Sequence, residues 1–332
     1  MGTIVGRRPL ATLAASALLA ACGGSQPPVG ARGATPQIAA IATHAGHDTS
    51  WMAPNANVKD LLYVTTDTVV DAYSYPQDEL EGQLTNFSYP LGDCTDTKGN
   101  VYITDYTKNT VVEYAHGGTQ PIGKVSVPGS GPVACAVDPS SGNLAVTTAG
   151  DTSGGGANLV VYRKAKGKPR TYTDPAIFSY AYCAYDRAGN LFVDGTPARG
   201  YGYDFELAEL PRQAKSLKAV NLEGGVSWAG GLQWDGHYLT VGQPVNPEIQ
   251  RYSISEGYGT LAGSTALAGA YDARQFIIAG GKAIVVNEYY YDRYIARWDV
   301  LVYDYPAGGY ETSEIIESGV PVYSVALSRR RK

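Results

Sequence analysis

The stretch Asp96-Thr-Lys-Gly-Asn-Val-Tyr-Ile-Thr-Asp105 joins a tight turn to a short apolar strand, and variants of it recur along the chain. An Asp followed by Gly-Asn is typical of a hairpin, because the carboxylate accepts backbone N–H groups and Gly tolerates a positive φ. Later copies have their turn glycine at Gly142, Gly189, Gly236 and Gly281. The steps between these glycines are 43, 47, 47 and 45 residues, so a structural unit repeats along the sequence.

A second recurring element is another apolar strand, which usually ends in Tyr. In each repeat it is separated by a loop from the strand that directly follows the turn. Its copies are Val69–Tyr73, Val111–Tyr114, Leu159–Tyr162, Phe205–Leu210, Ile249–Tyr252 and Val300–Tyr303. A unit of this length with several short strands fits one four-stranded blade of a β-propeller. We therefore predict an all-β, six-bladed β-propeller rather than a two-sheet sandwich, which would not require such a period.

The two ends of the repeat region predict how the ring closes. The region begins at Lys59-Asp60 with a second strand and has no first strand before it. Its last segment, Val320–Leu327, matches the first-strand pattern of Pro132–Asp138. We expect this last strand to complete the first blade beside Leu61–Val64, because that pairing removes an exposed sheet edge.

These repeats, over residues 60–328, resemble the NHL-type six-bladed β-propellers found in bacterial lipoproteins of uncharacterised function. That broad family includes scaffolds, binding proteins and some hydrolases and lyases. The resemblance therefore implies a fold much more firmly than a function.

The N-terminal segment predicts export and lipid attachment. Arg7 and Arg8 precede an apolar stretch, Leu10–Ala21, that is too short for a permanent membrane span. The sequence Leu19-Ala20-Ala21-Cys22 resembles the lipobox of bacterial lipoproteins. This resemblance implies cleavage before Cys22 and acylation of Cys22, whereas the alternative is a plain secretory signal. Several acyl chains anchor a protein stably where one does not.

The chain therefore divides into four predicted parts. They are a lipoprotein signal peptide at 1–21, a flexible tether at 22–50, the propeller at 51–328 and a basic tail at 329–332. We expect a monomer in the bacterial cell envelope, anchored to the membrane through Cys22 and facing the periplasm or the exterior. The tail is expected to be a solvated end, with contact to anionic lipid as the alternative.

The composition excludes several classes of protein. Of 332 residues, 44% are hydrophobic and 17% charged, and 40 Gly and 26 Tyr are inconsistent with disorder or a helical bundle. The formal net charge is −5 and the pI about 5.4, so we expect no nucleic-acid partner.

Propeller topology sorts the loops onto two faces. The turns after first and third strands form one face, here called the short-turn face. The loops after second and fourth strands form the other, the long-loop face, which includes 105–110, 148–158, 194–204, 242–249 and 287–299. Long loops on a rigid scaffold usually carry function, so we predict a ligand site on the long-loop face.

Aromatic residues gather near that face, and Tyr rings suit stacking on sugars or gripping an extended peptide. The predicted ligand-binding residues are Tyr180, Tyr182, Tyr201, Tyr203, Trp228, Tyr289, Tyr290 and Tyr291. The alternative for any one of them is a structural role, in which the ring caps a blade end or fills a gap between loops.

Catalytic signals are sparse, so we predict no catalytic residue and no cofactor. The chain has no nucleophile elbow, phosphate-binding loop or His-Glu-x-x-His motif, and its four His lie away from the long loops. Acids near the long-loop ends of strands include Asp93 and Asp272. Propeller lactonases hold Ca²⁺ with a similar ring, so a calcium site remains an alternative. Its weak candidates are Asp105, Asp194, Asn287 and Glu288.

Three cysteines, Cys94, Cys135 and Cys183, lie on the predicted first strands of successive blades. Cys135 and Cys183 each stand three residues before the Asp that begins the next hairpin turn, whereas Cys94 stands two residues before the corresponding Asp. Its side chain is therefore expected to point the opposite way. We expect three small buried apolar groups, with one disulfide as the open alternative.

The sequence thus favours a membrane-anchored, non-catalytic binding or scaffold module for a glycan, a peptide or an envelope protein. The alternative is a Ca²⁺-dependent lactonase-like hydrolase, or a lyase, with its site at the central channel.

Overall fold

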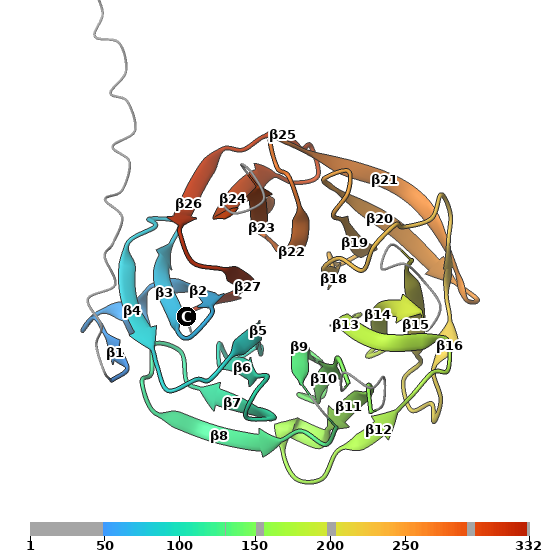
Figure 1. The fold of residues 1–332 in the computed structure, drawn as a ribbon, viewed down its shortest axis with the longest axis horizontal. Helices are drawn as coiled ribbons and strands as arrows, with labels where there is room; N and C mark the ends of the chain where they lie inside the picture. The colour runs from blue at the N-terminus through green and yellow to red at the C-terminus, as the bar shows by residue number, and fades with distance from the viewer. Residues whose placement is uncertain (1–48, 130, 151–155, 198–203, 291–295, 331–332) are drawn as a thin grey trace, which may run out of the picture. The chain divides into compact units, whose positions relative to one another are not determined.

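The computed structural model describes residues 49–332 except 130, 151–155, 198–203, 291–295 and 331–332. The predicted signal peptide, Cys22 and nearly all of the tether lie outside the described residues. Six sheets, each with four principal strands in antiparallel order, surround a central channel and form the six blades of a β-propeller (Figure 1), so the predicted fold is confirmed. Within the described part of the chain, no helix has the length and apolar character of a membrane span.

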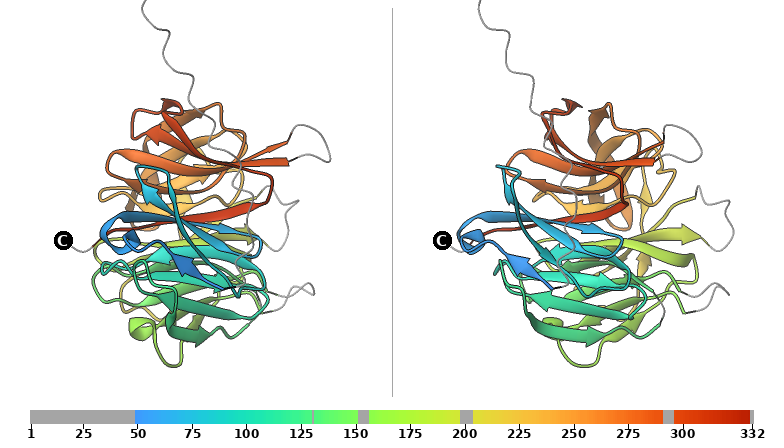
Figure 2. Two further views of the ribbon diagram at one scale, coloured as in Figure 1. Left: turned by 90° about the vertical axis from the view of Figure 1, so that its left-hand side faces the viewer. Right: turned by 60° about the vertical axis from the view of Figure 1, so that its left-hand side comes forward.

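Each blade is a small sheet whose strands run across the thickness of the ring (Figure 2). From the channel outward, blade 1 consists of β27 (Val322–Ser328), β2 (Asp60–Thr66), β3 (Val70–Tyr75), β4 (Leu80–Leu84) and β1 (Trp51–Met52). Blade 2 consists of β5 (Pro90–Thr95), β6 (Val101–Asp105), β7 (Thr110–Tyr114) and β8 (Pro121–Ser126). Blade 3 consists of β9 (Pro132–Val137), β10 (Leu144–Thr148), β11 (Leu159–Tyr162) and β12 (Arg170–Tyr172).

The remaining three blades follow the same order. Blade 4 consists of β13 (Ile177–Tyr185), β14 (Leu191–Pro197), β15 (Glu206–Leu210) and β16 (Lys218–Ala219). Blade 5 consists of β18 (Leu232–Trp234), β19 (Leu239–Gln243), β20 (Glu248–Ser255), β21 (Tyr258–Ala268) and β17 (Asn221–Leu222). Blade 6 consists of β22 (Ala273–Ala279), β23 (Lys282–Tyr290), β24 (Ala296–Asp304) and β26 (Ser313–Ser318). The sequence did not predict β25 (Gly309–Tyr310), which pairs in parallel with β21 of blade 5.

The repeated turns have the predicted geometry. All five turn glycines adopt a positive φ, between +72° and +112°. At the first turn, Asp96 Oδ1 accepts hydrogen bonds from the backbone N–H groups of Lys98 and Asn100, each at 2.8 Å. The side-chain carboxylate thus satisfies the turn, and the glycine allows the backbone to reverse.

The ring closes as predicted. Strand β27 pairs antiparallel with β2, with Leu61 opposite Ser328 and Val64 opposite Val325. In Figure 1 the last strand lies beside the first strands of the chain. Val325 is fully buried in a hydrophobic cluster shared by blades 6 and 1. The C-terminal segment therefore supplies the inner strand that blade 1 lacks.

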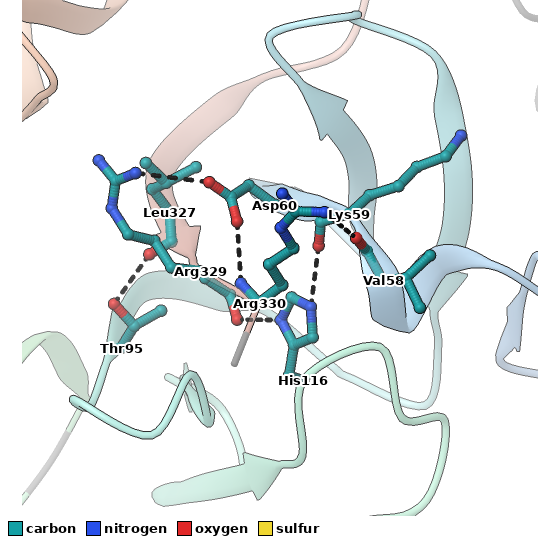
Figure 3. A network of polar contacts seen from close by, with 9 residues as sticks. Val58, Lys59, Asp60, Thr95, His116, Leu327, Arg329 and Arg330 are labelled. Atoms are coloured by element: carbon teal, nitrogen blue, oxygen red, sulfur yellow. Dashed lines mark hydrogen bonds and ion pairs between the residues drawn. The ribbon is translucent and has the colours of Figure 1, made fainter. Parts of the chain in front are cut away.

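Polar contacts fasten this closure on the short-turn face (Figure 3). The His116 ring lies between Ser328 Oγ, 2.6 Å from Nδ1, and the Lys59 carbonyl, 2.9 Å from Nε2. Asp60 accepts a hydrogen bond from the Arg330 backbone N–H at 2.9 Å and pairs with the Arg329 guanidinium at 3.4 Å. The first two tail residues are exposed, as expected, but they are bound to the start of β2.

The core consists of six hydrophobic clusters, each between two neighbouring blades. Of the five tyrosines that end predicted third strands, Tyr114, Tyr162, Tyr252 and Tyr303 are buried in these clusters, and Tyr73 is half-buried against one of them. Much of the Tyr content therefore fills the gaps between blades, which is the structural role that the sequence left open.

The expectation of three unbridged cysteines is wrong, because Cys94 and Cys135 form a disulfide and Cys183 is free and buried. The predicted opposite orientation of Cys94 is the physical reason. Neighbouring blades present opposite sheet faces to each other, so a side chain pointing forward from blade 2 meets one pointing back from blade 3. Cys135 and Cys183 point the same way and therefore cannot face each other.

Candidate functional site

The central channel contains a cavity of about 270 Å³ toward the long-loop face. All six inner strands contribute to its wall, and in every blade except blade 4 the lining residues lie at or near the start of the strand, at that face. These residues are 91–93, 133–135, 182–183, 231–232, 274–275 and 321–324. Val286, Glu288 and Trp298 of blade 6 complete the wall. This is the face on which the sequence predicted a ligand site.

A β-bulge in the inner strand shapes the cavity wall in most blades. The register between first and second strands shifts at this level in blades 1, 2, 3, 4 and 6. Bulges commonly redirect side chains at binding sites. Tyr182, Arg274 and Tyr323 all lie at such shifts and line the cavity.

Buried polar residues on second strands compensate for the hydrogen bonds that the bulges disrupt. Thr104 Oγ1 accepts from the Gly92 N–H at 2.8 Å, and Thr147 Oγ1 accepts from the Ala134 N–H at 3.0 Å. In blade 4 the same position holds Asp194, whose Oδ1 accepts from the Tyr182 N–H at 2.6 Å. This weak calcium candidate is fully buried, and burial raises its pKa well above the ordinary value. Asp194 therefore supports the bulge that presents Tyr182.

Charged side chains gather at the blade 6 side of the cavity. Arg274 Nε lies 2.6 Å from Asp272 Oδ2, and Arg274 Nη2 lies 3.1 Å from Glu288 Oε2. Burial raises the pKa of Asp272, although Arg274 opposes that shift. A guanidinium held between two carboxylates offers both donors and acceptors to a polar ligand.

Another carboxyl group of the cavity wall, Asp93, lies at the seam between blades 1 and 2. Its Oδ2 accepts from Thr65 Oγ1 at 3.0 Å, and its Oδ1 accepts from Ser324 Oγ. Burial raises the pKa of Asp93 to about 7, although the hydrogen bonds from Ser324 and Thr65 favour the charged form. This carboxyl group therefore changes charge near neutral pH.

Asp93 should make folding stability depend on pH. Its pKa is about 7 in the folded chain and about 4 in an unfolded one, so the folded state binds more protons in between. Stability should fall as pH rises from about 4 to 7. An Asp93→Asn variant, which stays neutral, should gain about 4 kcal/mol relative to wild type at pH 8 and little at pH 4. Denaturant unfolding at both pH values measures this, and a pH-independent difference would contradict it.

The aromatic residues that the sequence predicted as ligand-binding lie in different environments in the structure. Tyr182 lines the cavity. Tyr180 is only 1% exposed and accepts a hydrogen bond from the Asp174 N–H, so its ring belongs to the core between blades 3 and 4. Trp228 is half-buried just before β18. Tyr289 and Tyr290 belong to β23 opposite Arg297 and Ala296, while Tyr201, Tyr203 and Tyr291 lie outside the described residues.

The structure does not assemble the weak calcium candidates into one group. Asp105 accepts hydrogen bonds from the Ser88, Tyr89 and Lys108 N–H groups and so caps its own loop. Asn287 Oδ1 accepts in the same way from the Tyr271 and Asp272 N–H groups. Among the residues described, no three His, Cys, Asp or Glu side chains lie close enough together to hold a metal ion.

Sequence reasoning missed three cavity residues, Arg274, Trp298 and Tyr323. Tyr323 adds a ring whose hydroxyl lies 3.2 Å from the Tyr89 hydroxyl. The signal for Arg274 and Tyr323 was their place at the start of first strands, where the long-loop face meets the channel. Trp298 gave no such signal, because β24 is two strands away from the channel.

Comparisons with known proteins support the fold alone. No protein-family model matches this chain, and no curated protein is similar to it in sequence. The structure is similar to a chain in the crystal structure of a nidogen/laminin complex, with a TM-score of 0.64, 12% identity, and coverage of 82% of this chain and 100% of that one. A protein of unknown function from Bacteroides caccae has a TM-score of 0.59 and 11% identity, with coverage of 82% and 99%. The NHL-type assignment stays a prediction.

Proposed function

We propose that this chain is a non-catalytic binding module of the bacterial cell envelope, anchored through an acylated Cys22, and that its channel cavity binds one residue of a glycan. The observation that carries the proposal is the cavity itself. Its wall combines three aromatic side chains, Tyr182, Trp298 and Tyr323, with the charged groups of Arg274 and Glu288. Aromatic faces suit the apolar faces of sugar rings, and charged groups suit their hydroxyls.

The size of the cavity limits the ligand. A volume of about 270 Å³ is just below the usual range for small-molecule sites, so it admits a single sugar unit rather than an oligomer. The rest of a bound polymer would extend over the long-loop face, where Tyr289, Tyr290 and Tyr291 are proposed to contact it. Tyr201, Tyr203 and Trp228 are proposed to do the same from blades 4 and 5.

A glycan array and calorimetry with a soluble form beginning at Ser50 test this function. Tyr182→Ala and Arg274→Gln should each weaken binding of a glycan found on the array by about tenfold or more, because each removes a cavity-wall group. Tyr258→Ala is the matched control, since Tyr258 is 48% exposed on the outer strand β21. Equal affinity of all three variants would place the ligand elsewhere. Binding that required Ca²⁺ would favour the metal-dependent alternative.

The proposed anchor has a separate test. Replacing Cys22 by Ala should move the protein from the membrane fraction to the soluble fraction, because no thiol remains to be acylated. Membrane fractionation followed by immunoblotting measures the distribution. A Cys183→Ala variant is the control, since that thiol is buried in the propeller. A Cys22→Ala protein that stayed in the membrane fraction would refute lipid anchoring.

A further inference from the structure

We propose a second binding site, for an acidic polysaccharide, in a groove on the short-turn face between blades 3 and 4. The groove has a volume of about 730 Å³. Its walls are turns after the first and third strands of these two blades, within 138–143, 163–170, 185–191 and 210–214. Because these turns lie opposite the long-loop face, the groove is separate from the channel cavity and goes beyond the function proposed above.

Five basic side chains line the groove. They are Arg163, Lys164, Lys168, Arg170 and Arg212, and all five are exposed. None of them takes part in an ion pair among the described residues. The whole chain has a net charge of −5, so a basic groove without ion pairs is a local reversal of its charge. Such a concentration of one sign attracts ligands of the opposite sign.

The single acidic residue in the groove wall does not cancel this charge. Asp138 is 4% exposed, and its carboxylate accepts hydrogen bonds from the Ser140 N–H at 2.9 Å and from the Ser140 and Ser141 hydroxyls. Burial alone would raise its pKa, but these hydrogen bonds outweigh that effect and lower it. The Asp138 charge is therefore directed into its own turn and away from the groove.

The shape and the remaining residues of the groove favour a sugar polymer over a membrane surface. Tyr172 and Tyr185 line it and are half-buried, so they offer aromatic surface beside the cations. Binding to a lipid surface is usually supported by apolar side chains that insert into it. The exposed large hydrophobic residues of the described chain include none in the groove-lining turns. A concave basic groove with Tyr rings instead suits a chain of sugars carrying carboxylate, phosphate or sulfate groups.

Binding of two labelled acidic glycans, oligogalacturonate and heparin, by the purified full chain in neutral detergent tests the proposal. We expect binding of at least one of them that weakens as salt is raised, and no binding of neutral dextran. Lys168→Glu with Arg170→Glu should weaken that binding by roughly tenfold or more, since two attractive charges become repulsive. The matched control is Lys98→Glu with Lys124→Glu, which changes net charge equally on two exposed residues of blade 2.

The outcomes separate this site from its alternatives. Because the substituted side chains are exposed and outside the core, circular dichroism and the melting temperature should match wild type in both double variants. Equal loss of binding in the two double variants would show that only overall charge matters and would overturn the groove. Binding to phosphatidylglycerol vesicles that needed the groove residues, without binding to either glycan, would assign the groove to a membrane. The Tyr182→Ala cavity variant should bind the acidic glycan as wild type does.

Discussion

A Val325→Asp variant is expected to lose cooperative folding under conditions in which the wild type is fully folded. Val325 is fully buried on β27, opposite Val64 of β2, among side chains of blades 6 and 1. An Asp there would leave a carboxylate without a cationic partner in an apolar cluster. Such a buried charge costs more than about 4 kcal/mol, which is much of the stability of an ordinary domain.

The effect should exceed that of a usual core substitution because β27 holds the ring together. The backbone of Val325 is also bound by Gln275 of blade 6, whose amide donates to the Val325 carbonyl at 3.2 Å and accepts from its N–H at 3.0 Å. Near-ultraviolet circular dichroism and thermal unfolding measure the loss. Tyr310→Asp is the control, since Tyr310 is 79% exposed. A Val325→Asp protein that melted at the wild-type temperature would refute closure by β27.

Removing the inter-blade disulfide is expected to lower the free energy of unfolding by about 4 kcal/mol. Cys94 and Cys135 are 41 residues apart. In the chain-entropy description, a cross-link over a loop of that length lowers the conformational entropy of the unfolded chain and so stabilises the folded state by this amount. Guanidinium unfolding of Cys94→Ser with Cys135→Ser, compared with the oxidised wild type, measures the loss. Cys183→Ala is the control, because it removes a cysteine without breaking a bridge. A double variant with an unchanged midpoint would contradict this expectation.

The same register argument predicts where a second bridge can form. Ala136 of blade 3 is structurally equivalent to Cys94 of blade 2. On each first strand, this residue precedes the last residue that pairs with the second strand. Cys183 has the place in blade 4 that Cys135 has in blade 3, and it packs in one cluster with Ala136. An Ala136→Cys variant should therefore form a bridge with Cys183, seen as the loss of the free thiol. A thiol that stayed reactive in the unfolded, unreduced variant would contradict the register.

Most of the fold could be predicted from the sequence because each blade is a local structure. The turn at Asp96 and its copies, the third strands and the pairing of β27 beside Leu61–Val64 all follow from patterns within one period or at the two ends of the chain. The channel cavity lies toward the long-loop face, where the sequence predicted a ligand site, and that site stays a prediction. These features depend on strand alternation and chain order, which a sequence displays directly.

The positions of side chains between blades depended on the tertiary structure. The alternation of side chains along a strand showed that Cys94 and Cys135 point in opposite directions. Only the packing of blade 2 against blade 3 brings the two side chains together. The cavity depends similarly on bulges that bring Tyr182, Arg274 and Tyr323, from strands far apart in sequence, to one level of the channel. A single strand pattern carries no information about which residue of another blade lies across from it. The physical reason is that these contacts arise from packing between sheets, whereas the repeat records only pairing within them.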